Sequence, residues 1–316
     1  MTLTHTRRGL VFLALLLVSA SAASAQTHKP AAEYQSLLNL RFYEADGGFL
    51  VDGVQLVFPP QGVRRATFVL SKAGGGEVMS VPLRVEPFGS FPAFGRLVPD
   101  GNPGVVKVGQ PGEFVITIKV NGEAVSALPF SMKEERGTDP FNPTRRFTRE
   151  GLWRDLGFLS VRVDDAEARV SFNWWMSLRE LAAGVSRPLC TIHVMQGGQE
   201  IATSNSAVVP SGPDWQFFTR ELVEAKSVGK PTRQYLTRAA LTAKDGEYSV
   251  VVKVNGQPVK SYRLPVKGGQ IQTLDRSRLG YEPSTDFIAP RMIDTSAGSS
   301  SRDQMLETYW LQKSAK

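Results

Sequence analysis

Two stretches of the chain carry nearly the same eleven residues: GEFVITIKVNG at residues 112–122 and GEYSVVVKVNG at residues 246–256. They align without a gap, 134 positions apart. In each stretch apolar side chains occupy every second position, as expected of a strand with one buried face. Each ends in Asn-Gly, the pair that adopts positive φ in a type I′ turn and reverses the chain tightly. We therefore predict a β-hairpin at both places.

The likeness between the two halves extends upstream of these hairpins. The triplet Gly-Phe-Leu at 48–50 recurs at 157–159, and TFVL at 67–70 recurs as TIHV at 191–194, each time followed by a glycine turn. Short strands at this spacing favour an antiparallel sandwich. We predict an all-β chain of two tandem antiparallel β-sandwich domains of immunoglobulin-like form, with a short helical insertion in the second.

The segments outside the repeat complete the predicted domain organisation. Residues 134–149 have the glycine, proline and charge content of a linker, and a Ser- and Gly-rich stretch marks the end of an extended, flexible tail at 271–303. Residues 304–316 predict a short amphipathic C-terminal helix, because their apolar residues share one helical face. The remaining predicted parts are a signal peptide at 1–25, an N-terminal tail at 26–36, and the two modules at 37–133 and 150–270.

The N-terminus predicts export. Arg7 and Arg8 precede an unbroken apolar run at 10–18, and the small residues that a signal peptidase accepts follow. The run is shorter than the roughly 18 apolar residues that a membrane anchor needs. We expect cleavage between Ala25 and Gln26, by either the general or the twin-arginine route, and a periplasmic or extracellular protein with no membrane span in the mature chain.

The charge of the chain argues against nucleic acid as a partner. The formal net charge of +7 falls to +5 when Arg7 and Arg8 leave with the signal. The basic residues are scattered, with doublets such as Arg64-Arg65 at most. Nucleic-acid readers concentrate their charge on one face and carry a recognisable motif, and the sequence has neither feature.

The second copy of the repeat carries an insertion and most of the tryptophans. About fifteen extra residues lie within 164–187, including FNWWM at 172–176 and a stretch at 177–184 that predicts one or two helical turns ended by glycine. If Trp174 and Trp175 are in a strand, they point to opposite faces, so that one is buried and the other faces out. The alternative is that both pack between the sheet and the inserted helix.

Four tryptophans are the candidate binding residues. Trp174, Trp175 and Trp215 fall in the second module, and Trp310 lies in the predicted C-terminal helix, which docks either on its own domain or on a partner. Large aromatic surfaces are typical of protein interfaces and sugar-binding platforms. This distribution favours the second module as the contacting one.

The residues that nucleophilic or metal catalysis needs are few. A Ser-His-Asp system needs a histidine with an orienting carboxylate, and the mature chain has only His28 and His193. We interpret His193 as an ordinary surface residue and the single cysteine, Cys190, as a buried core thiol. Two histidines and one cysteine do not make a convincing zinc site, and no glycine-rich phosphate loop is present.

Paired carboxylates are the remaining catalytic candidates. Asp164-Asp165 and the pair of Asp245 and Glu247 are nominal pairs, but adjacent acids in turns are usually solvated. We expect no catalytic residue, no metal site and no cofactor.

Together these patterns predict an exported, non-catalytic binding protein of the cell envelope or extracellular space. It would contact a protein or envelope component mainly through the second module, by sheet faces or by strand addition. One alternative is a carbohydrate-binding module or a carboxylate-pair glycosidase on a β-sandwich. Another is a structural spacer without a ligand. Exposure of the tryptophans distinguishes a binder from a spacer.

Overall fold

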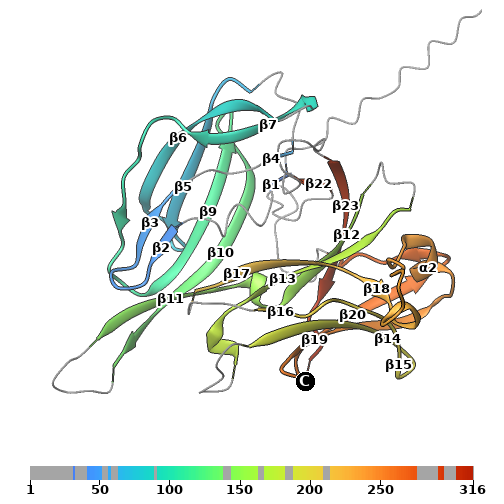
Figure 1. Cartoon of the computed structure of the whole chain (residues 1–316). Coiled ribbons are helices and arrows are strands. Elements are labelled where there is room, and N and C mark those ends of the chain that lie inside the picture. Colours follow the sequence, from blue (N-terminus) through green and yellow to red (C-terminus); the bar gives the residue numbers. More distant parts are fainter. Residues whose placement is uncertain are drawn as a thin grey trace, which may run out of the picture.

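The computed structural model describes residues 31–32, 41–51, 56–57, 63–88, 91–137, 144–162, 167–181, 188–208, 214–275, 291–294 and 304–315. These residues form antiparallel strands almost throughout, together with one five-residue α-helix, α2 (Arg238–Thr242), and short 3-10 turns (Figure 1). The all-β antiparallel sandwich architecture predicted from the repeat is confirmed.

The first module is built on a six-stranded sheet in the order β11-β10-β9-β5-β6-β7. A three-stranded sheet, β2-β3-β8, covers part of it, because Phe49 of β3 packs edge-on against Phe130 of β10 at a ring distance of 5.8 Å. The strands are β1 (Ala31–Ala32), β2 (Arg41–Tyr43), β3 (Gly48–Leu50), β4 (Leu56–Val57), β5 (Ala66–Lys72), β6 (Glu77–Phe88), β7 (Phe91–Pro99), β8 (Val106–Lys107), β9 (Gly112–Val120), β10 (Glu123–Arg136) and β11 (Arg145–Gly151).

The second module pairs a seven-stranded sheet with a five-stranded one. The first has the order β18-β15-β14-β19-β20-β21, with β16 also pairing with β14, and the second has the order β17-β13-β12-β23-β22. Phe172 of β13 meets Tyr262 of β20 across the core, with ring centroids 5.2 Å apart. The strands are β12 (Leu156–Arg162), β13 (Val170–Met176), β14 (Leu189–Gln196), β15 (Gln199–Thr203), β16 (Ala207–Val208), β17 (Gln216–Glu221), β18 (Val223–Glu224), β19 (Gly246–Val254), β20 (Gln257–Lys267), β21 (Gln270–Ile271), β22 (Arg291–Asp294) and β23 (Gln304–Gln312).

The two modules repeat the same strand register. Phe68 pairs with Ile118 between β5 and β9, and the matched residues Ile192 and Val252 pair between β14 and β19. The hairpins β9–β10 and β19–β20 also share their register, including a bulge just beyond the turn. The likeness of the two sequences is therefore a likeness of backbone structure.

The Asn-Gly turns make the same contacts in both modules. Asn121 and Asn255 have positive φ, 53° and 47°. The side-chain oxygen of Asn121 accepts hydrogen bonds from the amides of Arg64 (2.8 Å) and Arg65 (3.2 Å), and that of Asn255 accepts one from the amide of Leu189 (2.8 Å). Each asparagine thus closes its own turn and holds the start of the neighbouring strand.

The strands β12 and β13 of the five-stranded sheet are buried on both faces. Leu159 and Trp174 pack against the seven-stranded sheet, whereas Phe158 and Trp175 belong to a second cluster that also contains Phe130 of the first module. Because neighbouring residues in a strand point to opposite faces, this sheet is apolar at successive positions.

The inserted segment contains the helical turn expected at 177–184. The 3-10 turn η2 (Leu178–Glu180) begins after Ser177, whose side chain accepts a hydrogen bond from the amide of Arg179 at 3.2 Å. Two further 3-10 turns are η1 (Leu152–Arg154) and η3 (Ala225–Ser227). Residues 182–187 lie outside the described part of the chain.

The prediction of a linker at 134–149 is wrong for the residues of this range that the structure describes. β10 continues to Arg136, and β11 pairs with it from Gly151 opposite Phe130 to Arg145 opposite Arg136. The segment is therefore a hairpin of the first module that projects from the sheet (Figure 1). Glu135, Arg136, Arg145 and Arg146 are exposed, and exposed charged residues of a strand resemble linker composition, because water covers both kinds of segment.

The prediction of a C-terminal helix at 304–316 is also wrong. Residues 304–312 form strand β23 between β12 and β22. Trp310 and Leu311 are both buried, on opposite faces of the sheet. Pairs of apolar neighbours satisfy a helical face and a doubly buried strand equally well, so spacing alone did not separate the two structures.

The predicted flexible tail at 271–303 contributes to the second module. Ile271 is buried, and β22 pairs with β23. The predicted signal peptide at 1–25 and, apart from β1, the predicted tail at 26–36 lie outside the described residues. Within the described residues, none of the helices has the length and apolar character to cross a bilayer.

Candidate functional site

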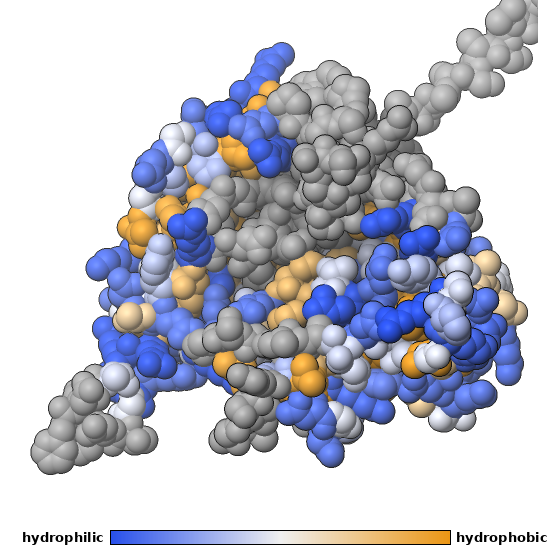
Figure 2. Space-filling model, in the orientation of Figure 1, coloured by the Kyte–Doolittle hydropathy of each residue, from blue (hydrophilic) through white to orange (hydrophobic). Residues whose placement is uncertain are grey.

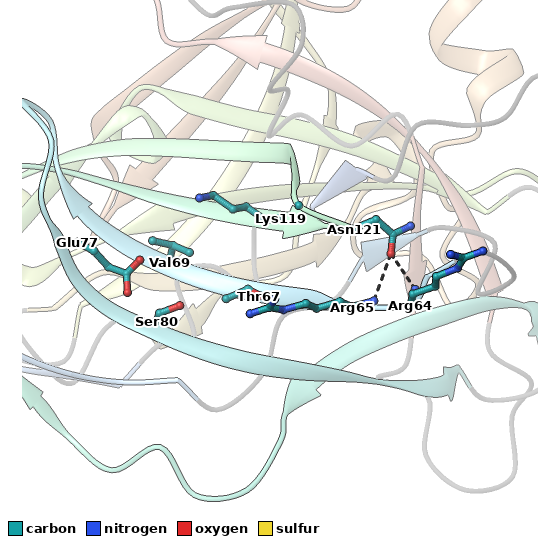
Figure 3. A pocket seen from close by; sticks show the side chains of 9 residues that line it. Arg64, Arg65, Thr67, Val69, Glu77, Ser80, Lys119 and Asn121 are labelled. Atoms are coloured by element: carbon teal, nitrogen blue, oxygen red, sulfur yellow. Dashed lines mark hydrogen bonds between the residues drawn. The ribbon is translucent and has the colours of Figure 1, made fainter.

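One face of the six-stranded sheet carries a groove (Figure 3). Phe68 of β5 points into the core, so Thr67 and Val69 lie on the opposite face. Lys119 of β9 pairs with Thr67, and Ser80 of β6 pairs with Val69. Since paired residues of antiparallel strands share a face, these side chains come together on the outside of the sheet.

The groove has a volume of about 760 Å³, within the range of ligand-binding clefts. Its floor is apolar at Val69, which is only 4% exposed although it faces away from the core. The other lining residues are Arg64, Arg65, Glu77, Asn121 and Gly122.

The Asn-Gly turn positions the basic end of the groove. Asn121 holds the amides of Arg64 and Arg65, and its own amide donates to the carbonyl oxygen of Arg65 at 2.7 Å. The backbone of the arginine pair is therefore fixed while both side chains stay exposed. The Asn-Gly turn of the repeat therefore also fixes the positions from which the two arginine side chains extend.

Within the part of the chain that the structure describes, the charges of the groove are not neutralised by neighbouring side chains. Three cations and one carboxylate line it, and in the described part of the chain none of the four forms an ion pair. Other arginines of the same sheet do: Arg96 binds Glu86 at 2.8 Å, and Arg145 binds Glu134 at 2.9 Å. Free cations beside hydroxyl groups suit an anionic ligand.

The matched face of the second module is chemically different. His193 stands where Val69 stands in the first module; its Nδ1 lies 2.6 Å from the Glu200 carboxylate and its Nε2 lies 2.9 Å from Thr191 Oγ1. His193 was predicted to be a surface residue on the outward side of its strand; it lies on that side, partly exposed, between two polar partners.

The order hydroxyl, imidazole, carboxylate resembles a nucleophile triad, but the array lies on a paired strand. Thr191 is paired with Lys253 of β19, and the amide of Ile192 donates a hydrogen bond to Ser204 Oγ at 3.0 Å. A nucleophile of this kind needs free N–H groups that stabilise an oxyanion. We interpret the array as polar groups of a sheet face that satisfy one another.

The structure places all four candidate tryptophans in the interior. Trp174, Trp175 and Trp310 are at most 1% exposed, and Trp215 is 7% exposed. The expectation that one of Trp174 and Trp175 faces outward is wrong, because both faces of their sheet are covered. Trp174 stacks on Phe218, and Trp175 lies against Trp310. None of these indoles forms a surface platform in this fold.

The inserted turn η2 joins the two modules. Arg179 reaches the first module, where its guanidinium lies 3.5 Å from Glu44 and 3.8 Å from Glu135. The next side chain, Glu180, lies 2.7 Å from Lys260 of the second module. Burial raises the pKa of the Glu44 carboxyl, which Arg179 partly opposes. These ion pairs link the two modules, so we call the inserted turn η2, which the first copy lacks, the clasp.

Lys260 is the most deeply buried charged side chain in contact with the clasp. Its ammonium donates to the carbonyl oxygens of Trp175 (2.7 Å) and Arg154 (3.2 Å) and lies 5.1 Å from the Trp215 ring. Burial lowers the pKa of Lys260 to about 8, although Glu180 opposes the shift. With all its contacts made inside the protein, Lys260 is a structural group.

Arg149 makes a second connection between the modules. Its guanidinium binds Asp214 at 2.7 Å and lies over the Phe42 ring at 4.7 Å, and its carbonyl oxygen accepts a hydrogen bond from Trp215 Nε1 at 2.7 Å. Trp215, predicted to contact a partner, thus contacts the first module of its own chain.

The other carboxylate candidates contact neighbouring groups of their own module where they are described. Asp245 accepts hydrogen bonds from the amides of Gly268 and Gly269, which lower its pKa, and Glu247 pairs with Arg263. Asp164 and Asp165 lie outside the described residues.

Cys190 is buried, and burial raises the pKa of its thiol to about 12, the opposite of an activated nucleophile. In the described part of the chain, no group of three or more His, Cys, Asp or Glu side chains is placed to hold a metal ion.

Sequence reasoning missed the groove as a site. It noted the doublet Arg64-Arg65 only as scattered charge and did not connect it with Lys119 or Glu77. The signal was available in the alternation of β5 and β9, which places one set of residues on the face away from the core. No family model, curated protein or solved structure matches the chain.

Proposed function

We propose that this chain is an exported, non-catalytic binding protein of the cell envelope or extracellular space, and that the groove of its first module holds an anionic group of a protein or envelope partner. The single observation that carries the proposal is the set of cations in the groove, Arg64, Arg65 and Lys119, which have no ion-pair partner among the described residues. The N-terminal pattern of basic, apolar and small residues supports export.

The lining of the groove favours binding over chemistry. Thr67 and Ser80 supply hydroxyl groups, but none of the described lining residues is a histidine or cysteine that could activate a nucleophile. Glu77 is the only carboxylate among them, whereas glycoside hydrolysis by the common route needs two.

The surface agrees with recognition by charge and hydrogen bonds. Figure 2 shows a mainly hydrophilic described surface, interrupted by smaller apolar areas. None of the described residues that line the groove is aromatic, so it offers no stacking platform for a sugar ring. We therefore propose the groove of the first module, and not the tryptophans of the second module, as the contact surface.

The experiment is isothermal titration of the mature protein with a capped hexaglutamate peptide at low ionic strength. The variant replaces Arg64, Arg65 and Lys119 with glutamine. We expect binding to weaken about tenfold or more, since each exposed charge contact typically changes affinity by a factor of two to five, and to weaken further with added salt.

A charge-matched control replaces Lys230, Lys253 and Lys267 of the second module with glutamine. It lowers the net charge equally, and Lys253 occupies the position that matches Lys119. We expect this control to bind like the unaltered protein. Equal affinity of the groove variant and the control would contradict the proposal and would favour the spacer alternative.

A further inference from the structure

The charges of the groove are separated along β5. Arg65 precedes the strand and Lys119 is level with Thr67, so both cations lie at its start. Glu77 is level with Ser71, at the opposite end. Figure 3 shows the same order, with Glu77 far from the arginines and Lys119 nearer to them. The groove is therefore dipolar, with a basic end and an acidic end.

A second carboxylate, Glu113, lies beyond the acidic end and is not among the residues that line the groove. Glu113 lies on β9 at a position that alternation places on the same face as Lys119. Its carbonyl oxygen accepts a hydrogen bond from the amide of Ala73 at 2.8 Å, just beyond the end of β5. Glu113 is exposed, like Glu77. An entirely anionic ligand would meet repulsion here.

The dimensions of the groove suit an extended chain. From residue 65 to residue 71 a strand covers roughly 20 Å, at about 3.3 Å per residue. Outward side chains recur every second residue, a spacing of roughly 7 Å that an extended peptide shares. A ligand lying along β5 would present its own side chains at the same interval.

The lining chemistry favours a peptide over a saccharide. The hydroxyl groups of Thr67 and Ser80 can exchange hydrogen bonds with backbone amides. Sugar rings are usually held by aromatic faces, which the described lining residues do not supply.

We infer that the groove receives an extended peptide segment with acidic side chains at one end and basic side chains at the other end. Its acidic end lies toward Arg64 and Arg65, and its basic end lies toward Glu77. This inference rests on the proposed binding function and names the class of ligand that the same site takes.

The test uses three capped peptides of equal length. They are Asp-Asp-Val-Ala-Lys-Lys, Asp-Asp-Val-Ala-Gln-Gln and Gln-Gln-Val-Ala-Lys-Lys, titrated calorimetrically into the mature protein at low ionic strength. We expect the dipolar peptide to bind about threefold to fivefold more tightly than the acidic one, and the basic one to bind weakest.

Two variants separate the two ends. Glu77→Gln should remove the preference for the dipolar peptide and leave the acidic peptide bound as well or better, because a repulsive charge has gone. The variant with Arg64, Arg65 and Lys119 replaced by glutamine should weaken both. Glu123→Gln, at an exposed carboxylate on the far side of the Asn-Gly turn, is the matched control and should change nothing.

The outcomes are distinguishable. If the acidic peptide binds through the cations but Glu77→Gln leaves the preference unaltered or strengthens binding of the dipolar peptide, the ligand is simply anionic: the inference fails and the proposed function stands. Tighter binding of a sulfated hexasaccharide than of the dipolar peptide also overturns the inference alone. If no peptide responds to loss of the cations, both are wrong.

Discussion

The outer faces of the two modules differ although their strands and register are the same. In the first module Val69 forms an apolar floor, and Glu77 has no ion-pair partner among the described residues. In the second module His193 takes the place of Val69 and contacts Glu200, which matches Glu77. The same backbone therefore carries an open, charged groove in one copy and a set of polar groups that bind one another in the other copy.

A second difference lies on the buried side of the β9–β10 and β19–β20 hairpins. Ser126 pairs with Ile118 next to the bulge in the first module, and Lys260 holds the same position opposite Val252 in the second. Both residues are buried. The lysine has a partner because the inserted turn η2 brings Glu180 to it, and the first copy has no such insertion.

The largest expected effect comes from breaking this buried ion pair. Glu180→Ala leaves the Lys260 ammonium buried with only carbonyl acceptors, and we expect the free energy of unfolding to fall by about 3 kcal/mol. The measurement is urea unfolding at pH 7, followed by tryptophan fluorescence.

Ser126→Ala is the matched control for that experiment. The Ser126 hydroxyl has no hydrogen-bond partner among the described residues, so its removal should cost less than about 0.5 kcal/mol or stabilise slightly. Similar losses for the two variants would show that the insertion does not act as a clasp.

A smaller effect is expected from the two Asn-Gly turns, where the modules should behave alike. Asn121→Ala and Asn255→Ala each place alanine at positive φ and remove side-chain hydrogen bonds to the neighbouring strand. We expect each to lower the free energy of unfolding by about 1 to 2 kcal/mol. Urea unfolding measures both, and a difference above about 1 kcal/mol would contradict the structural equivalence of the turns.

The smallest expected effect is a pH dependence that only the second module carries. Because the pKa of Lys260 is about 8 when folded and 10.5 in its ordinary state, the unfolded chain binds more protons above pH 8. The free energy of unfolding should therefore rise with pH through this window, by at most about 1.4 kcal/mol per unit.

The pH range of that measurement is set by the other buried groups. The raised pKa of Cys190 acts in the opposite direction above its ordinary value of 9, so the comparison is made between pH 8 and pH 9. Lys260→Met should abolish the rise. A fall in stability of the unaltered protein, relative to Lys260→Met, would contradict the assignment.

Much of the fold could be predicted from local pattern, and the errors at the tryptophans and at the C-terminal strand have one cause. Alternation followed by Asn-Gly located both hairpins, because a strand with one buried face has an apolar residue at every second position. The same rule failed for Trp175 and Trp310, because their sheet is covered on both sides and the alternation disappears. Burial on the second face depends on contacts with distant parts of the chain.

The groove was less predictable than the fold. Its cations come from the start of β5 and from β9, which are more than fifty positions apart in the sequence, and only strand pairing brings Arg65 and Lys119 onto one face. A list of charged residues could not show this. The alternation of β5 and β9, combined with their pairing, does place these residues on one face.

By itself the sequence determined that the chain is a duplicated antiparallel β protein, because periodicity and turn residues act over short distances and are visible in local sequence. The burial of the tryptophans, the ion pairs of the inserted turn with both modules and the position of the groove cations on one face are properties of the tertiary structure. Those facts depend on which faces meet, and packing between segments far apart in the sequence leaves no local pattern.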